Sequence, residues 1–255
     1  MTTLENIQIY QNEYQRRCEP ARKEFASRKV VKEIFTEGVE PKLLKLFMIH
    51  WSALSAGLTE PIPAYLKRAG ERCEEEGLKE MAEFFYQHEE EEEGHDNWAT
   101  EDVKKLVDTW NLEEPNFHID SKELLNHKMS PAVKRYHQLH ERVIEGDSPC
   151  AELAIDVEIE LISTTYGPLL LKSWVESMGQ NSLPSISFLH EHVRADVGHT
   201  ETNFEVVHKL LAQHPEYTDT LVETAGDALN SYADFLDDAM NYAKKMYALV
   251  SKASV

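Results

Sequence analysis

The pattern H-x3-(D/E)-x-G-H occurs twice in the chain, at 88–95 and again at 192–199. In an α-helix, positions i, i+4 and i+7 share one face because the helix repeats about every 3.6 residues. We therefore expect each copy to lie in a helix and to present two imidazoles and one carboxylate on a single face. A helical bundle is the fold that can turn two such faces toward each other in its core.

The rest of the sequence also favours helices. The 255 residues include only 10 Gly and 10 Pro, whereas good helix formers such as Glu, Leu, Ala and Lys are abundant. No segment shifts in composition as a linker would, so we expect a single domain over 1–255. Apolar periodicity, prolines at first-turn positions and closing glycines predict helices over 41–57, 64–110, 131–146, 149–178, 184–213 and 217–251, with a break near Gly77 and an irregular segment at 111–130.

Charge and cysteine usage narrow the classes of function. The formal net charge is −20, which repels phosphate backbones and anionic lipid, so we expect no nucleic-acid or membrane partner but a small-molecule substrate. No apolar stretch approaches the ~18 residues that a transmembrane helix needs. The first residues lack the apolar core of a secretory signal, and three scattered cysteines favour a reducing compartment. We expect a cytoplasmic protein, with a homodimer left open.

The two copies of the motif together offer more ligands than one metal ion can use. Four imidazoles and two or three carboxylates suit two ions bridged by a carboxylate, and such nitrogen and oxygen donors favour Fe(II) or Mn(II). Glu92 is expected to bridge the ions or to support a ligand. The other glutamates of the 89–93 run are expected to form a solvated face. The candidate ligands from the motif are His88, His95, His192, Asp196 and His199.

A further carboxylate is expected from the helix at 149–178. Glu158 and Glu160 lie in an apolar stretch, and an unpaired buried charge there would be costly. Their side chains point about 200° apart, so both cannot face one site. Periodicity alone does not choose between them.

Gly94 and Gly198 occupy the same place in the two copies, directly before the last histidine. A glycine inside a helix costs about 1 kcal/mol relative to alanine. We therefore expect a close helix contact or local unwinding at both positions.

The late motif, His192-x3-Asp196-x2-His199, a glutamate on the preceding helix and a histidine on an early core helix resemble the haem-oxygenase-like diiron oxidases. This family shares its fold with haem oxygenase, thiaminase and pyrroloquinoline-quinone synthase. The resemblance covers most of the chain in helix order and length, and its motif is specific on the late helix and looser elsewhere. It implies an all-α, haem-oxygenase-like single-domain bundle of about seven core helices.

The same resemblance implies a site and an activity. Glu160 precedes His192 by 32 residues, a spacing like that of the family, so the resemblance selects Glu160 over Glu158. One iron would then be held by His88, His95 and His192, and the other by Glu160, Asp196 and His199. The implied function is O2-dependent oxidation of a small amino-acid-like substrate by two iron ions, with dioxygen as co-substrate. The reaction would be N-oxygenation, desaturation, C–C cleavage or a rearrangement such as nitrile formation.

The sequence departs from the family at one ligand. Relatives usually carry a glutamate seven residues before the early histidine, where this chain has His88. The departure resembles a subgroup of the family that includes an amino-acid nitrile-forming enzyme. A histidine-rich site carries less negative charge, so we expect weaker iron binding, completed when substrate binds.

Three other interpretations stay open on the sequence. A thiaminase-like or pyrroloquinoline-quinone-synthase-like enzyme without metal would need a nucleophile, for which Cys150 at a helix start is the candidate. A non-enzymatic metal- or haem-binding protein would use one histidine as an axial ligand, and a structural helical protein would carry its histidines incidentally. Phe84, Tyr166 and Phe188 are the expected lining of a substrate pocket.

Overall fold

The computed structural model describes residues 4–253, with the side chains of residues 13–252, and its regular structure is entirely helical. The predicted all-α class is therefore confirmed within this range. Residues 1–3 and 254–255 of the predicted domain 1–255 lie outside the described residues. The described part of the chain contains no helix long and apolar enough to cross a membrane.

The helices follow one another with short connections. Short π and 3-10 segments lie at Glu33–Glu37, Pro149–Ala151, Gln180–Ser185 and Pro215–Tyr217. The α-helices are α1 (Leu4–Ser27), α2 (Lys29–Lys32), α3 (Pro41–Thr59), α4 (Ile62–Glu75), α5 (Lys79–Glu92), α6 (His95–Glu113), α7 (Ser121–Asn126), α8 (Pro131–Ile144), α9 (Glu152–Met178), α10 (Ser187–Gln213) and α11 (Thr218–Ala253).

Two helices begin at the prolines that predicted their starts. Pro41 and Pro131 each occupy the first turn, where a missing N–H costs nothing. The side chain of Glu40 accepts a hydrogen bond from the Leu43 backbone N at 3.0 Å. Ser130 Oγ accepts one from the Val133 backbone N at 3.2 Å. Local chemistry thus sets both starts, because these caps satisfy N–H groups that the helix itself leaves unpaired.

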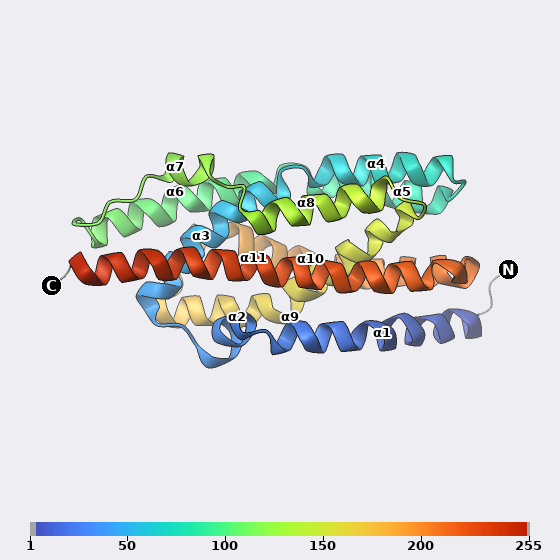
Figure 1. The fold of residues 1–255 in the computed structure, drawn as a ribbon, viewed down its shortest axis with the longest axis horizontal. Coiled ribbons are helices and arrows are strands. Elements are labelled where there is room, and N and C mark those ends of the chain that lie inside the picture. Colours follow the sequence, from blue (N-terminus) through green and yellow to red (C-terminus); the bar gives the residue numbers. More distant parts are fainter. Residues whose placement is uncertain (1–3, 254–255) are drawn as a thin grey trace.

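The longest helix, α11, organises the bundle. It runs the length of the molecule with α1 along one side and α8 along the other (Figure 1), and it also packs against α3 and α9. Helix α3 is buried at every residue from Leu44 to Leu58, as expected for a helix that is apolar on all sides. The core therefore surrounds α3, and α6, which begins with the last histidine of the first motif copy, packs against it.

Helices α9 and α10 pack closely, and Gly167 shows why. A Cβ on Gly167 would lie 2.3 Å from Cγ2 of Val193 on α10, a distance that real atoms do not tolerate. The absent side chain therefore lets the two helix backbones approach. This approach brings Glu160 of α9 and Asp196 of α10 to the same part of the core.

The expected helix over 64–110 is three helices, which corrects the prediction for the first motif copy. Gly94 has φ of +84° and forms the break between α5 and α6, because glycine adopts this left-handed conformation without steric cost. His88 and Glu92 therefore end α5, whereas His95 begins α6. The three do not share one continuous helical face. With this split, the described residues include nine helices of 14 residues or more, against about seven expected.

The second copy follows the prediction for its backbone. It lies within the uninterrupted helix α10, so His192, Asp196 and His199 do share a face. The predicted unwinding or close contact at Gly198 is wrong, because α10 continues through it and a Cβ there would meet open space. The two equivalent glycines therefore have different roles, and only Gly94 shapes the backbone.

Candidate metal centre

The two motif copies meet across the bundle, together with Glu160. Among the described residues, three groups of imidazole and carboxylate side chains each place their donor atoms within 4.8 Å of one another. One group comes from α5, α6 and α10, one from α9 and α10, and one from α5 and α10. They are Glu92 with His95 and His192, Glu160 with Asp196 and His199, and His88 with Glu91 and His199.

In the first group, hydrogen bonds fix the two imidazole rings. His95 Nδ1 lies 2.8 Å from Glu92 Oε2, and His192 Nδ1 donates to the Phe188 carbonyl oxygen at 2.8 Å. A histidine that donates through Nδ1 keeps the lone pair on Nε2 for a metal ion. The two rings meet edge to face with centroids 4.8 Å apart. The arrangement therefore fixes the tautomer of His192 and the orientation of both rings.

In the second group, one carboxylate oxygen faces two imidazoles. Glu160 Oε1 lies 3.4 Å from His88 Nε2 and 3.6 Å from His199 Nδ1, and His199 Nδ1 lies 3.8 Å from Asp196 Oδ1. Asn203 Nδ2 donates to the other oxygen of Glu160 at 2.6 Å. The Asn203 contact leaves Glu160 Oε1 as the oxygen that is turned toward the two rings.

These spacings fit a metal ion better than hydrogen bonds. Glu160 Oε1 and His199 Nδ1 are buried and have no hydrogen-bond partner among the described residues, although buried polar atoms are nearly always paired. Two donors about 2.1 Å from one ion lie about 3 to 3.5 Å apart. The unpaired atoms and their 3.4 to 3.8 Å separations are therefore compatible with donors to one metal ion, and the residues fit the expected metal.

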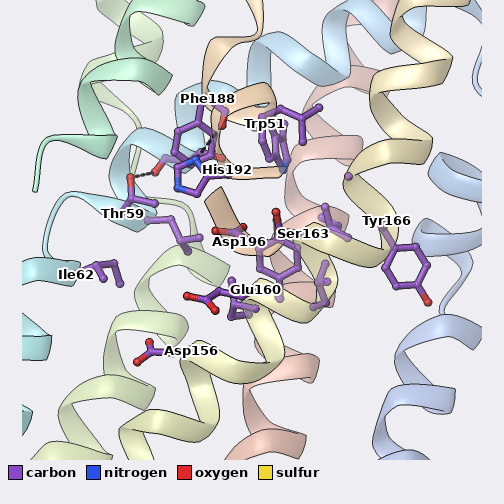
Figure 2. A pocket seen from close by; sticks show the side chains of 18 of the residues that line it. Trp51, Thr59, Ile62, Asp156, Glu160, Ser163, Tyr166, Phe188, His192 and Asp196 are labelled. Carbon is purple, nitrogen blue, oxygen red and sulfur yellow. Dashed lines mark hydrogen bonds between the residues drawn. The ribbon is translucent and has the colours of Figure 1, made fainter. Parts of the chain in front are cut away.

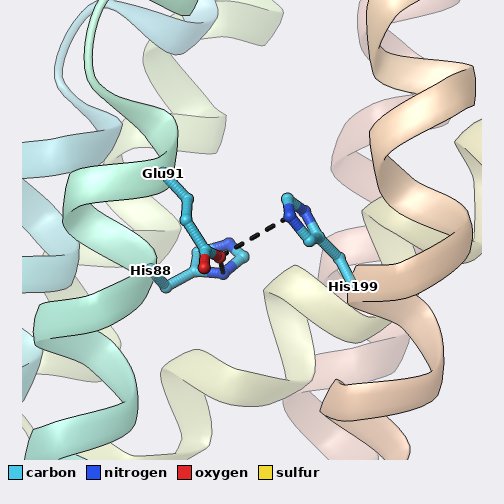
Figure 3. A group of neighbouring side chains, drawn as sticks. All are labelled: His88, Glu91 and His199. Atoms are coloured by element: carbon cyan, nitrogen blue, oxygen red, sulfur yellow. Dashed lines mark ion pairs between the residues drawn. The ribbon is translucent and has the colours of Figure 1, made fainter.

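Glu91 is exposed, as predicted for the glutamate run, but its carboxylate also lies beside the donor groups. Its Oε2 lies 3.5 Å from His199 Nε2 and 3.8 Å from His88 Nδ1. Figure 3 shows Glu91 and His88 of α5 turned toward His199 of α10. The Glu91 side chain is 37% exposed, so it lies on the solvent side of these donors. The sequence did not distinguish Glu91 from its neighbours, because each of the five consecutive glutamates fits the pattern of a solvated face.

The grouping of the ligands also differs from the prediction. His88 was expected with His95 and His192, but the structure places Glu92 with those two rings and His88 with Glu160 and His199. The break at Gly94 is the reason, because it lets His95 fold back onto Glu92 three residues earlier. Glu92 is therefore itself a member of the first group.

Burial and neighbouring charge separate the carboxylates into two kinds. Burial acts to raise the pKa of Glu92, but the hydrogen bond from His95 and the nearby imidazoles lower it to about 2. Burial raises the pKa of Asp196 to about 7, and burial with Asp196 and Glu92 raises that of Glu160 well above its usual range. Burial lowers the pKa of His88 and His192. Burial thus favours the neutral, ligating form of His88 and His192, and a cation would offset the charge on Glu160 and Asp196.

A cavity of about 120 Å³ adjoins the donors. Figure 2 shows the cavity, with His192, Asp196 and Glu160 among its lining side chains. Tyr166 and Phe188 line it as predicted. Phe84 does not, because it lies one turn before His88 on α5 and stacks on that ring, with centroids 5.7 Å apart.

Several lining residues were not predicted as part of a pocket. Trp51 of α3 lies edge to face with Phe188, with centroids 5.5 Å apart. Tyr136 of α8, Asp156 of α9 and Tyr232 of α11 also belong to the unpredicted polar and aromatic lining. Trp51 was placed in a core helix by its apolar surroundings, but no sequence signal distinguishes a core position from one beside a cavity.

Cys150 does not have the properties of a catalytic thiol. It is fully buried, it is not among the residues that line the cavity, and burial raises its pKa to about 12. A thiol nucleophile needs a lowered pKa and access to substrate. The cysteine mechanism that the sequence left open therefore has no support at this residue.

Comparison with known proteins establishes the fold. The sequence matches no family model and no curated protein. The structure is similar to a domain of unknown function with a haem oxygenase-like fold from Shewanella denitrificans, with a TM-score of 0.68 and 18% identity over 94% of this chain and 93% of the other. It is also similar to a TenA homolog from Pseudomonas syringae pv. tomato, with a TM-score of 0.67 and 12% identity over 90% of this chain and 92% of the other. The chain thus has the predicted haem-oxygenase-like fold, and identities this low establish the fold alone.

Proposed function

We propose that the protein is an O2-dependent non-haem dinuclear metal oxidase or oxygenase that acts on a small amino-acid-like substrate. One observation carries the proposal: imidazole and carboxylate donors from α5, α6, α9 and α10 converge beside a small cavity. Two such groups of donors within one helical bundle suit a pair of ions. Iron in such a site supplies the electrons that reduce dioxygen.

Two of the three donor groups would each hold one ion. Glu92, His95 and His192 would hold the first, and Glu160, Asp196 and His199 the second. His88 and Glu91 adjoin the second group, and we expect them to complete it. Nitrogen and carboxylate oxygen favour iron or manganese, and no cysteine belongs to these groups among the described residues.

The protein's own side chains would position these ligands and keep the site dry. The Phe188 carbonyl oxygen holds the His192 ring, and Asn203 holds the Glu160 carboxylate. Trp98 stacks on His95 with centroids 4.4 Å apart. The aromatic and aliphatic cavity lining limits water near the donors, which strengthens each electrostatic contact inside. These contacts would preorganise the site before substrate binds.

Anaerobic titration with Fe(II) tests the proposal. We expect uptake of about two irons per chain, increased by a bound substrate, and a transient visible absorption when O2 is admitted. His192→Ala should remove most of this uptake without unfolding the chain. His190→Ala is the matched control, because this exposed histidine lies two residues earlier on α10 and belongs to no donor group. Absence of uptake by the wild-type protein, with or without substrate, would overturn the proposal.

A metal-free enzyme of the TenA kind is the second candidate, because the fold is also that of a TenA homolog. Asp196 and Glu160, whose pKa values burial raises, would then act as acid–base groups in the cavity. Such an enzyme would keep its activity in the presence of a chelator. A non-enzymatic metal-binding protein would instead take up iron and consume no oxygen with any substrate.

A further inference from the structure

Asp156 is a buried carboxylate beside the cavity that the metal centre does not use. It lies on α9 one turn before Glu160, lines the cavity and is 8% exposed. Figure 2 shows it on the same part of α9 as Glu160. Its Oδ2 is buried and has no hydrogen-bond partner among the described residues. Asp156 belongs to none of the three donor groups, so its oxygen needs another partner.

Protonation alone does not provide that partner. Burial, with Glu152, Glu160 and Glu92 nearby, raises the pKa of Asp156 well above its usual range, so this environment disfavours the charged form of Asp156 when no cation is near. A neutral carboxylic acid still needs hydrogen-bond partners for its oxygens when it is buried. Glu152, one turn earlier, is itself fully buried and paired with His140. The surroundings of Asp156 thus favour a positively charged group.

Four carboxylates line the cavity and could bind a cation. Among the described residues, no lysine or arginine lines it to bind an anion. The carboxylates are Glu92, Asp156, Glu160 and Asp196. With metal bound, three of them would ligate ions, and Asp156 would remain. Aromatic and aliphatic side chains, including Trp51, make up most of the rest. This distribution of charge fits a ligand with a cationic head and an apolar tail.

We propose that Asp156 binds the ammonium group of the substrate, and that the substrate is a small primary amine with an aromatic tail. The cavity volume of about 120 Å³ is close to that of an engineered cavity of about 150 Å³ that holds benzene, so it limits the tail to about one ring. Trp51, Phe188 and Tyr166 are the rings that would contact the tail. That the bound amine is a substrate rests on the proposed oxidase function, whereas amine binding by Asp156 does not depend on it.

Three ligands of similar shape and different charge test the inference. 2-Phenylethylamine carries an ammonium group where 2-phenylethanol carries a hydroxyl, and 3-phenylpropanoate carries a negative charge instead. Calorimetric titration of the wild-type protein, metal-free and loaded anaerobically with Fe(II), should show the amine binding at least about tenfold more tightly than the alcohol. The metal-free protein should not bind 3-phenylpropanoate measurably.

Variants identify the residue responsible. Asp156→Asn should abolish the preference for the amine over the alcohol, whereas Asp156→Glu should keep a preference for the amine. Glu176→Gln is the matched control, because it removes one exposed carboxylate from the same helix. The wild-type preference for the amine is itself a test if Asp156→Asn does not fold. Equal binding of amine and alcohol, or an unchanged preference in Asp156→Asn, would overturn the inference.

Iron content measured on the same samples separates this inference from the oxidase function. Asp156→Asn should take up as much Fe(II) as the wild type, because Asp156 is outside the donor groups. Amine binding that depends on Asp156 in a protein without iron uptake would support the amine site and contradict the oxidase. Iron uptake with no preference for the amine would contradict only the amine site.

Discussion

Glu158 and Glu160 lie two residues apart on α9, and their carboxylates have partners on different helices. Glu158 binds Arg22 of α1 through two hydrogen bonds of 2.8 and 2.7 Å. Glu160 accepts a hydrogen bond from Asn203 of α10 and faces His88 of α5. The two side chains project about 200° apart around the helix. Glu158 therefore joins α9 to α1, whereas Glu160 faces the candidate metal centre.

The two glutamates should respond oppositely to the same substitution. Glu158→Gln should lower the free energy of unfolding by about 3 kcal/mol, because it leaves the mostly buried Arg22 guanidinium without its charged partner, and iron uptake should persist. Glu160→Gln should remove most iron uptake with little loss of stability at neutral pH. Chemical denaturation and iron analysis measure the two effects. Loss of iron from Glu158→Gln with Glu160→Gln unaffected would contradict this division.

Glu91 should contribute to metal affinity although it is partly exposed. Glu91→Gln should weaken Fe(II) binding by about 10- to 100-fold, as loss of a carboxylate in or near a metal site commonly does, because its Oε2 lies between His88 and His199. Glu90→Gln is the control, since Glu90 is exposed and belongs to no donor group. Competition against a metal-sensitive dye measures both affinities. Equal Fe(II) affinities in the two variants would show that Glu91 is a solvated residue that does not contribute to metal binding.

The stability of the metal-free protein should depend on the ionisation of Asp196. Its pKa is raised from 3.8 to about 7, mainly by burial, so the folded state favours the protonated form. This contribution to stability is fully present below about pH 3.8 and is lost as the pH rises through about 7. Asp196→Asn cannot ionise. The variant should therefore gain stability relative to the wild type between pH 4 and pH 7, by on the order of 4 kcal/mol at most.

Denaturant titrations of both proteins in a chelator, at intervals from pH 4 to pH 8, measure this difference. Fe(II) should remove it in the wild type, because a bound cation favours the ionised carboxylate. A difference in stability that stays constant with pH would show that Asp196 titrates near its ordinary value. A difference that shrinks as the pH rises would contradict the sign of the pKa shift.

Cys150 should be dispensable for activity. Cys150→Ser replaces a fully buried thiol that burial keeps protonated, so oxygen consumption by the iron-loaded protein should stay within about twofold of the wild type. The free energy of unfolding should fall by about 1–3 kcal/mol, because a buried hydroxyl without a partner is costly. Loss of activity at unchanged stability would favour the thiol mechanism instead.

The sequence predicted those features that depend on local chemistry. The starts of α3 and α8 follow from Pro41 and Pro131, whose effect is confined to one helical turn. The all-α class follows from composition and periodicity, which depend on no distant contact. Within the second motif copy, the shared face of His192, Asp196 and His199 follows from helix geometry alone.

The backbone of the first motif copy could not be predicted from local sequence. Gly94 and Gly198 occupy the same position in the motif. Gly94 nevertheless interrupts the helix between α5 and α6, whereas Gly198 lies within α10. A glycine tolerates either backbone conformation, so packing around it decides which one it adopts. Glu92 was predicted from its motif position, whereas the contacts of Glu91 with His88 and His199 could not be read from the glutamate run.

Local sequence was sufficient to predict that the chain forms helices and that each motif copy contributes imidazole and carboxylate side chains, because helical periodicity is a property of neighbouring residues. The packing of the helices, in contrast, sets which donors share a group, and it places Asp156 beside a cavity with one oxygen that has no partner among the described residues. Those relationships join residues on different helices, and the angle and spacing between packed helices depend on the whole core rather than on any local pattern.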